Sequence, residues 1–430
     1  MAAHSETFYA AVMPVDVTPP IGTYLDGYGS RKEPANDIHD PLFATLLMLK
    51  AGSDGVALVT LDLVGITLSF TEKLKAALSP VLGISGEAIL VSAIHTHAGP
   101  VGFMGRVPLL GNFDDPLLQE IFLRKIRGAA VWVKDHLQPV QVGIGRGEIH
   151  DIGRNRNDPE HGLNDSELGV LRVDDANGQP LAVLMNYGCH PTVLGPDNLA
   201  ISADYPGAAR TALRKIYPGT AFLFTNGASG DVSTRFTRRG QGFAEVERMG
   251  NILAGEVLKV MQVVTPLEEV AVSSHVATFD LALRHFPSVD EARKKIETLE
   301  AELKQKRAAG LPAGEIRKAV TKLEGAQGQL DMAQSYGDTK TVATVVQLLR
   351  IGPVALVTMP GEPFTHIVLE IKKHSPIHPT FVVSYGNDYR GYFPDAVSVA
   401  AGTYEALMSP YDETIGDKLI QTALTLLAER

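Results

Sequence analysis

Two histidines placed two residues apart, His95 and His97, are the residues whose type and spacing most strongly suggest chemistry. They follow an apolar run at residues 88–93, which predicts a buried strand. Because side chains alternate along a strand, we expect both imidazoles to point to the same face. Imidazole binds metal ions and carries a proton near neutral pH. The pair therefore predicts two metal ligands, or one ligand beside an acid–base group, with two exposed loop histidines as the plain alternative.

Four other apolar segments also run into polar loops that contain glycine. They are residues 181–186 before His190, residues 221–225 before Asn226 and Asp231, residues 354–359 before Glu362, and residues 381–384 before residues 385–392. In open α/β sheets, functional groups collect beyond the carboxyl ends of the strands. Five such loops predict one site assembled at one edge of a sheet.

The elements that must position these residues alternate between strand and helix patterns. Apolar runs at residues 44–51 and 56–63 predict strands, and periodic stretches at about 69–82 and 117–137 predict amphipathic helices. This alternation is typical of the α/β class. A glycine-rich loop is expected at residues 21–29 as pocket wall or plain connection.

A second loop, at residues 103–117, carries apolar residues that include Met104, Leu109 and Leu110. It is expected either to contact an apolar substrate or to pack on the core.

A charged segment at about residues 288–335 interrupts the alternation. Ser288 and Glu291 have the spacing of a capping box. The helix that begins there and a second helix at about 315–335 each carry an apolar stripe, and a turn at residues 308–314 joins them. We expect an inserted αα-hairpin that serves as a lid, as an arm for a homo-oligomer, or only as a solvated decoration.

Length and composition bound the class of protein. The chain has 430 residues, 45% hydrophobic and 20% charged, and we expect one domain over residues 1–430 with the hairpin as an insertion. The net charge of −10, with no basic run, does not favour a nucleic-acid partner. The single cysteine, Cys189, rules out an internal disulfide.

No apolar stretch approaches the roughly 18 residues that a membrane-spanning helix needs. The N-terminus shows no leader pattern. We therefore expect a soluble, cytoplasmic protein, or a periplasmic or secreted one if a signal peptide has been removed.

Eight short motifs give the chain a resemblance to the neutral (non-lysosomal) ceramidases, because they occur in the order in which that family carries them. They are Val15-Asp-Val-Thr-Pro-Pro20, His95-Thr-His-Ala-Gly-Pro100, Asn155-Arg156, His190-Pro-Thr192, Gly230-Asp-Val-Ser233, Gly361-Glu362, Asn387-Asp-Tyr-Arg-Gly-Tyr392 and Tyr404-Glu-Ala406. The resemblance implies layered mixed β-sheets flanked by helices, with the active site at the carboxyl ends of the strands.

The sequence also departs from the family pattern. Thr234 stands where the family has proline, and Pro363 is inserted before Phe364. We expect the chain to correspond to the catalytic domain, without the family's C-terminal immunoglobulin-like domain and with the hairpin added.

The resemblance implies a zinc ion held by His95, His190, Glu362 and Tyr392, with Tyr389 as the alternative tyrosine. A tyrosine ligand is unusual beside the common His, Asp, Glu and Cys set. Zinc lowers the pKa of its bound water, and the resulting hydroxide attacks a carbonyl carbon.

The resemblance also implies three catalytic residues. His97 protonates the leaving amine, while Arg156 and Tyr404 stabilise the oxyanion. Asn226 and Asp231 are expected to accept the second N–H of the ligating histidines, or Asp231 only to shape a turn.

Together these residues predict a zinc-dependent hydrolase that cleaves a ceramide-like N-acyl amide. Two alternatives stay open: a zinc hydrolase of a non-ceramide amide or ester, and a metal-bound protein without activity. His97 and Arg156 argue against the second, because neither is needed merely to hold zinc. The expected partner is a small amide substrate, of lipid type if the resemblance extends to the substrate.

Overall fold

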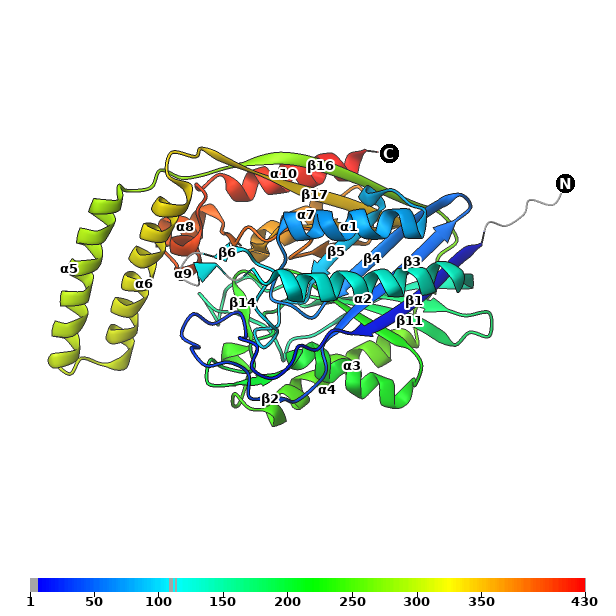
Figure 1. The fold of residues 1–430 in the computed structure, drawn as a ribbon, viewed down its shortest axis with the longest axis horizontal. Coiled ribbons are helices and arrows are strands. Elements are labelled where there is room, and N and C mark those ends of the chain that lie inside the picture. The colour runs from blue at the N-terminus through cyan, green and yellow to red at the C-terminus, as the bar shows by residue number, and fades with distance from the viewer. Residues whose placement is uncertain (1–6, 108–110, 113, 430) are drawn as a thin grey trace.

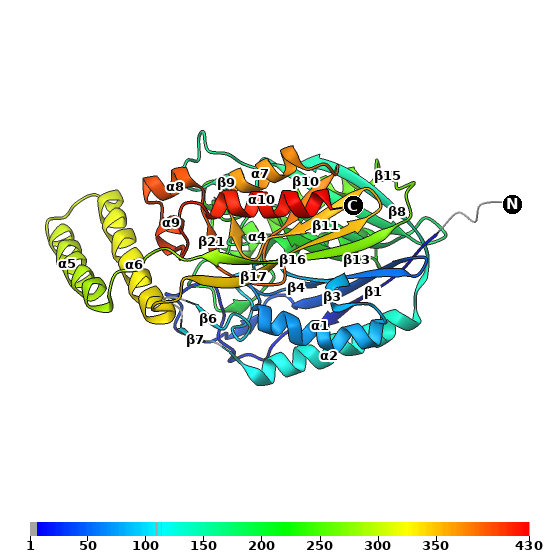
Figure 2. The same ribbon diagram turned by 90° about the horizontal axis from the view of Figure 1, so that it is seen from above.

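Two β-sheets packed face to face form the centre of the fold in the computed structural model, which describes residues 7–107, 111–112 and 114–429 (Figures 1 and 2). The larger sheet has the order β13-β11-β10-β8-β1-β3-β4-β5, with β15 paired to β8, and the smaller has the order β16-β17-β18-β20. Their strands are β1 (Phe8–Asp16), β3 (Phe43–Ala51), β4 (Asp54–Leu61), β5 (Ile89–Ala93), β8 (Gln138–Glu148), β10 (Glu167–Asp174), β11 (Pro180–Tyr187), β13 (Ala221–Asn226), β15 (Thr265–Pro266), β16 (Val272–Ala282), β17 (Thr341–Ile351), β18 (Val354–Thr358) and β20 (Thr380–Val383).

Helices cover the outer faces of both sheets, so the fold has four layers. Figure 2 shows α7 and α10 on one side of the sheets and α1 and α2 on the other. Strands β4 and β5 are parallel, whereas β1 and β3 are antiparallel. This confirms the predicted α/β class of layered mixed sheets flanked by helices. The larger sheet packs against α1 (Leu68–Leu82), α2 (Pro116–Asp135), α3 (Asp204–Ile216) and α4 (Phe243–Met261), and the smaller packs against α7 (Thr365–His374) and α10 (Ile415–Ala428).

The strands are continuous apolar runs because both of their faces are buried. In β3, Leu46 and Met48 belong to the core under the helices of the larger sheet, while Leu47 and Leu49 belong to the core between the sheets. Successive residues of β3 therefore pack alternately against the helices and against the smaller sheet.

Short elements surround the strand ends. β9 pairs with β14, and β19 pairs with β21. Their bounds are β2 (Asp37–Ile38), β6 (Arg106–Val107), β7 (Gly111–Asn112), β9 (Arg154–Asn155), β12 (Ala200–Ile201), β14 (Val232–Ser233), β19 (Glu362–Pro363), β21 (Tyr392–Phe393), η1 (Gly86–Ala88), η2 (Thr234–Phe236), α8 (Ala396–Ala401) and α9 (Tyr404–Met408).

Three βαβ units bring strand ends together. The units β4-α1-β5, β11-α3-β13 and β18-α7-β20 each join parallel neighbours. The first two belong to the larger sheet and the third to the smaller. The prediction of a site at one edge of one sheet is therefore wrong. Periodicity along the chain identifies strands but does not tell which strands share a sheet.

The segment at residues 384–387, after β20, ties the two sheets together. Asn387 N donates to Val91 O at 2.7 Å, and Ala93 N donates to Tyr385 O at 3.3 Å, so the segment bonds to β5. Tyr385 and Asn387 have φ values of +56° and +62°, which non-glycine residues rarely adopt.

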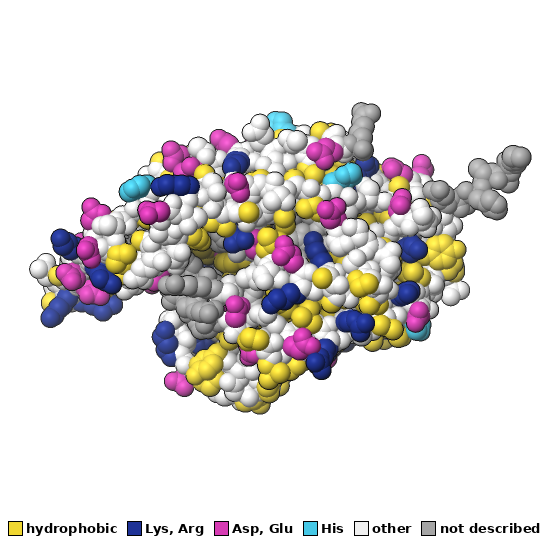
Figure 3. Space-filling view, turned by 45° about the horizontal axis from the view of Figure 1, so that its top comes forward, with side chains coloured by type: hydrophobic (Ala, Val, Ile, Leu, Met, Phe, Trp, Pro, Cys, Tyr) yellow, Lys and Arg dark blue, Asp and Glu magenta, His cyan; other side chains and the backbone are white. Residues whose placement is uncertain are grey.

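The helices α5 (Val289–Ala308) and α6 (Ala313–Tyr336) form the inserted hairpin between β16 and β17. Ser288 and Glu291 make the expected capping box. The pair projects from the body in Figures 1 and 2, and Figure 3 shows acidic and basic side chains together on that end. Association of copies through this hairpin stays a prediction.

The structure also bears on two smaller expectations, one about the loop at residues 103–117 and one about membrane-spanning helices. Met104 is buried, at 5% exposed, while Leu109 and Leu110 lie outside the described residues. Among the helices described, none is both long and apolar enough to cross a membrane.

A buried ion pair joins α3 to the end of β4 and gives a stability prediction. Arg210 Nη1 and Nη2 donate to the two oxygens of Asp62 at 2.9 and 2.6 Å, with side chains 2% and 1% exposed. Arg210→Met leaves the carboxylate buried and unpaired, which should lower the free energy of unfolding by about 3–5 kcal/mol. Urea unfolding measures this loss.

The matched control is Arg124→Met, since Arg124 pairs with Glu120 in an ion pair whose side chains are 79% and 49% exposed. Its loss should stay below about 1 kcal/mol. Equal losses for the two variants would contradict the prediction.

Candidate metal centre and active site

Three histidine rings meet beyond the carboxyl ends of β5 and β11. His97 Nε2 lies 3.1 Å from His95 Nε2, and one ligand atom from each of His95, His97 and His190 lies within 4.8 Å of the others. His95 and His190 are only 2% and 1% exposed. Three imidazoles this close could hold a metal ion.

His95 reaches the centre through a turn and not through strand alternation. Strand β5 ends at Ala93, and His95 has a φ of +72°, in the left-handed region. Its N–H donates to Leu63 O at 2.9 Å. We expected both imidazoles to point to the same face of a strand; their Nε2 atoms do meet, but a turn after the strand brings them together and not period-two alternation.

Backbone carbonyls set the tautomers of two histidines. His95 Nδ1 lies 2.7 Å from Val64 O, and His190 Nδ1 lies 3.1 Å from Val232 O. A carbonyl can only accept, so each Nδ1 carries the hydrogen and each Nε2 presents a lone pair to the centre. His97 differs, because its buried Nδ1 has no hydrogen-bond partner in the described part of the chain. Ligating histidines almost always donate their second N–H, so this difference separates His97 from the other two.

Glu362 brings a carboxylate from the smaller sheet to the same centre. Its Oε2 lies 2.9 Å from His190 Nε2 and 3.7 Å from His95 Nε2. The shorter distance is that of a hydrogen bond, yet no donor among the described residues is aligned with Oε2. Because both Nε2 atoms present lone pairs, these acceptors repel one another unless a cation lies between them. The donor set therefore fits a metal ion.

Burial keeps the three imidazoles neutral. Desolvation lowers the pKa of His95 and of His190 to about 3 and holds the pKa of His97 well below its ordinary value. The positive charge of Arg156 acts in the same direction. Neutral imidazole is the form that binds a metal.

Two tyrosines flank Glu362 with different contacts. Tyr389 Oη donates to Glu362 Oε1 at 2.5 Å. Tyr392 is the backbone partner of Glu362 in the β19–β21 pair, and its Oη accepts from Arg156 Nη2 at 3.1 Å. Burial and then the Glu362 charge raise the pKa of both phenols well above the ordinary value. Both tyrosines therefore lie where a ligand is expected.

Arg156 is held by Glu405, an acidic residue to which the sequence analysis gave no role. Arg156 Nε lies 2.7 Å from Glu405 Oε1, so the two side chains form an ion pair, although the N–H is not aligned for a hydrogen bond. Arg156 Nη2 donates to Gly230 O at 2.6 Å. Burial alone would lower the pKa of Arg156, but Glu405 and then Tyr392 raise it well above the ordinary value. The signal for Glu405 was its place beside Tyr404 in the last motif.

Tyr404 begins α9 and is half-buried. Burial raises its pKa, and Glu324 and Glu405 act in the same direction while Arg156 opposes them. Its neighbour in α9, Glu405, pairs with Arg156 at 2.7 Å, so α9 lies beside Arg156.

Asn226 acts on the backbone and not on a histidine ring. Its Nδ2 donates to Ile94 O at 3.3 Å and to Cys189 O at 3.1 Å, and its Oδ1 accepts from Cys189 N at 3.1 Å. It thus ties the residue before His95 to the residue before His190.

Asp231 likewise forms its hydrogen bonds with groups other than the histidine rings. Its Oδ1 accepts from Thr365 N and Oγ1 at 2.8 Å, and its Oδ2 accepts from Asn155 Nδ2 at 2.9 Å. The expectation that Asn226 and Asp231 accept the histidine N–H groups is wrong, because backbone carbonyls already do so.

The glycine-rich loop at residues 21–29 packs on His97 and is more than a connection. A Cβ on Gly27, whose φ is +95°, would lie 2.4 Å from His97 Cγ. The Tyr28 ring meets the imidazole edge-on at 4.9 Å, and Arg31 Nη1 donates to His97 O at 2.9 Å. Packing therefore orients the His97 ring.

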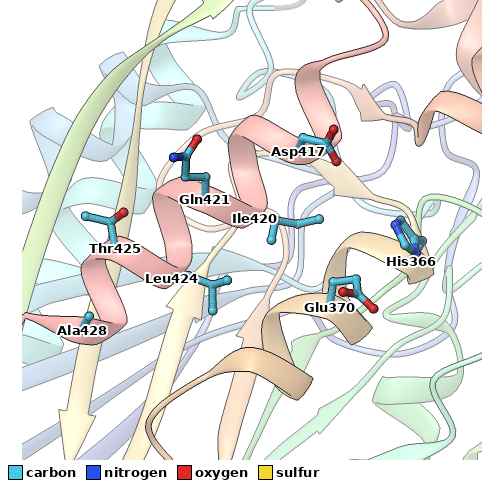
Figure 4. A pocket seen from close by; sticks show the side chains of 8 residues that line it. All are labelled: His366, Glu370, Asp417, Ile420, Gln421, Leu424, Thr425 and Ala428. Atoms are coloured by element: carbon cyan, nitrogen blue, oxygen red, sulfur yellow. The ribbon is translucent and has the colours of Figure 1, made fainter.

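A separate hollow of about 620 Å³ lies between α7 and α10 (Figure 4). His366 and Glu370 of α7 and Asp417 of α10 line it, together with Ile420 and Leu424. Within the described residues, these side chains do not form a group as close as the three histidines. We therefore place no metal there.

The chain is similar to proteins of known sequence. A family profile described as neutral/alkaline non-lysosomal ceramidase, N-terminal, matches residues 9–237. Neutral ceramidase 2 of Arabidopsis thaliana is 26% identical over 255 residues, which cover 54% of this chain and 32% of that protein. Neutral ceramidase of Pseudomonas aeruginosa is 27% identical over 206 residues, which cover 43% of this chain and 30% of that protein. The matched region spans about a third of the length of these relatives.

The fold is similar to solved structures over nearly its whole length. The crystal structure of neutral ceramidase from Pseudomonas aeruginosa has a TM-score of 0.76 and 18% identity, covering 98% of this chain and 74% of that one. A second ceramidase structure also gives 0.76, with 16% identity and coverages of 98% and 75%. At such identity the likeness establishes the fold.

The contact between Gly27 and His97 generates a prediction. Gly27→Ala adds a methyl group against the imidazole, and such overpacking should lower the free energy of unfolding by about 1–3 kcal/mol beyond the backbone strain. Gly22→Ala is the control, because Gly22 has the same φ of +95° with nothing within 4 Å. Urea unfolding of both variants measures the difference, and a crystal structure should show His97 displaced. Equal losses with an unmoved ring would contradict the prediction.

Proposed function

The chain belongs to the neutral/alkaline non-lysosomal ceramidase family, and from this premise we propose that it is a zinc-dependent amidase cleaving the linear C–N bond of a ceramide-like N-acyl amide. One observation carries the proposal. His95, His190 and Glu362 bring mutually facing acceptor atoms from two sheets to one buried centre. A cation bound between these buried acceptors would remove their mutual repulsion.

The spacing of these atoms supports zinc. Zinc bonds nitrogen and oxygen at about 2.0–2.2 Å, so neighbouring ligand atoms of a tetrahedral site lie about 3.3 Å apart. The distances from Glu362 Oε2 to His190 and His95 Nε2, 2.9 and 3.7 Å, bracket that value. When bound, zinc would lower the pKa of a water molecule towards neutrality and polarise the substrate carbonyl.

We assign Tyr392 as the fourth ligand. Arg156 donates to its oxygen, and a cation beside a phenol favours loss of the phenol's proton. Tyr389 is the alternative, although its Oη already donates to Glu362.

His97 is proposed as the proton carrier. Its Nε2 faces the centre at 3.1 Å from His95 Nε2, and packing holds its ring without a carbonyl at Nδ1. A neutral imidazole can take a proton from the attacking water and give it to the leaving amine nitrogen.

Arg156 and Tyr404 are proposed to bind the developing oxyanion. The guanidinium stays charged beside Glu405, and Tyr404 precedes Glu405 in α9. Removing one such donor typically costs about 10²–10³ in turnover.

The names of the relatives support a ceramide-like substrate over other amides and esters. We also propose that residues 1–430 form one catalytic domain with an inserted hairpin.

A hydrolysis screen tests the function. Metal analysis of the purified protein should find one zinc per chain. The protein should hydrolyse N-acyl amides of long acyl chain faster than short ones, lose activity with a chelator and recover it with zinc. Hydrolysis of esters alone would favour the other zinc hydrolase, and bound zinc without hydrolysis would favour an inactive metal-binding protein.

Replacing His95 and replacing His97 should have different consequences for zinc content and activity. His95→Ala removes a ligand and should lose both zinc and activity. His97→Ala should keep zinc while turnover falls by roughly 10²–10⁴, the usual range for a general acid–base group. The loss should be smaller for an ester with a good leaving group, which needs no proton to depart.

Zinc content and both activities, measured on each variant, decide the assignment. If His97→Ala loses zinc as readily as His95→Ala, then His97 is a ligand, as its place in the three-histidine group would also permit.

A further inference from the structure

The root of the inserted hairpin is bonded to α9, the short helix that begins with Tyr404. Arg284 follows β16 closely and donates from Nη2 to Leu407 O at 2.8 Å and from Nη1 to Ala406 O at 3.3 Å. Its own N–H donates to Pro410 O at 3.0 Å. Ala406 O has no helical partner four residues on, because Pro410 lacks an N–H. Arg284 therefore completes the carboxyl end of α9.

A second contact comes from the helix α6 of the hairpin. A Cβ on Gly325 would lie 3.0 Å from Leu407 Cδ1 and 3.1 Å from Leu407 Cβ. A side chain at this position of α6 would therefore require Leu407 of α9 to shift by a few tenths of an ångström.

Helix α9 in turn holds the Arg156 side of the site. Glu405 pairs with Arg156 at 2.7 Å and accepts from Asn157 Nδ2 at 3.1 Å. Ser409 Oγ, directly after the helix, donates to Tyr392 O at 3.0 Å. A displacement of α9 would therefore reach Arg156, Tyr392 and Tyr404 together.

We propose that the hairpin positions α9, and that Arg284 and Gly325 are positioning residues for Arg156 and Tyr404. The consequence for catalysis rests on the proposed function, whereas the mechanical link between the hairpin and α9 does not. In this role the hairpin acts through Arg284 at its root and through the middle of α6, and its far end is not required. This differs from the lid and the oligomer arm expected from the sequence.

Gly325→Val tests the link by placing a branched side chain against Leu407. Turnover of the N-acyl amide should fall about 10-fold or more, since small misplacements of catalytic groups have effects of this order. The Michaelis constant should change little and the protein should keep its zinc, because three of the four proposed ligands, His95, His190 and Glu362, follow β5, β11 and β18 and are not held by α9. Gly314→Val is the matched control in the same helix, as Gly314 has nothing within 4 Å. Its turnover should equal that of the wild type.

Two further variants keep the test decisive if Gly325→Val folds poorly. Arg284→Gln should lower turnover in the same way, and Leu407→Ala should restore turnover to the Gly325→Val protein by making room. The effects of Gly325→Val and Glu405→Gln should combine less than additively, because both act through Arg156. If the losses of turnover in these two variants were fully additive, the proposal that Gly325 acts through α9 and Arg156 would be wrong.

Hydrogen exchange of the backbone amides at residues 404–408 gives a readout that needs no activity. Exchange should be faster in Gly325→Val and Arg284→Gln than in the wild type and in Gly314→Val. Unchanged exchange in both variants, or faster exchange with unchanged turnover, overturns the inference while the proposed function stands. A wild-type protein that hydrolyses no amide or ester sinks the proposed function, and the exchange rates still decide the link.

Discussion

The site exists only where two sheets meet, and the hydrogen bonds that join the ends of those sheets are the constraint on which the rest depends. Ser384 N donates to Asn226 O at 2.8 Å at the end of β13, and Asn387 N donates to Val91 O at 2.7 Å in β5. These bonds hold the smaller sheet, which supplies Glu362, against the larger sheet, which supplies the histidines. Functional groups must be held within about 0.5 Å to work together, and main-chain bonds between two rigid sheets can do so.

This arrangement has a cost in the polypeptide itself. His95, Tyr385 and Asn387 all have positive φ, and each such residue costs on the order of 1–3 kcal/mol. The facing lone pairs of the two histidines and Glu362 add electrostatic repulsion. Backbone strain of this kind persists only where contacts with the surrounding structure hold the residues in place. The binding of a cation would offset both the strain and the repulsion. Folding and metal binding are therefore expected to be coupled.

The residues of the site fall into two structural groups. His95, His190 and Glu362 follow buried strands; main-chain carbonyls orient the two histidines, and Tyr389 donates to Glu362. Arg156 and Tyr404 instead lie on short peripheral elements, held by the Glu405 ion pair and by the hairpin root. The first group thus depends on the core of the fold, and the second depends on contacts with α9 and with the inserted hairpin.

The sequence by itself determined the α/β class, the helix with its capping box at Ser288, and the polar residues that follow the apolar strands, because local patterns of hydrophobicity and side-chain chemistry make them visible. The roles of Arg156, Tyr392 and Tyr404 were expected only from the resemblance to a family. Only the tertiary structure decided that two sheets contribute to the site, that a left-handed turn aims His95, and that Val64 and Val232 carbonyls orient the histidines. Every residue has a carbonyl, so its use as an acceptor leaves no mark in the sequence. The role of Arg284 left no mark in the sequence, and that of Glu405 left only its place beside Tyr404, because both roles depend on contacts between segments far apart in the chain.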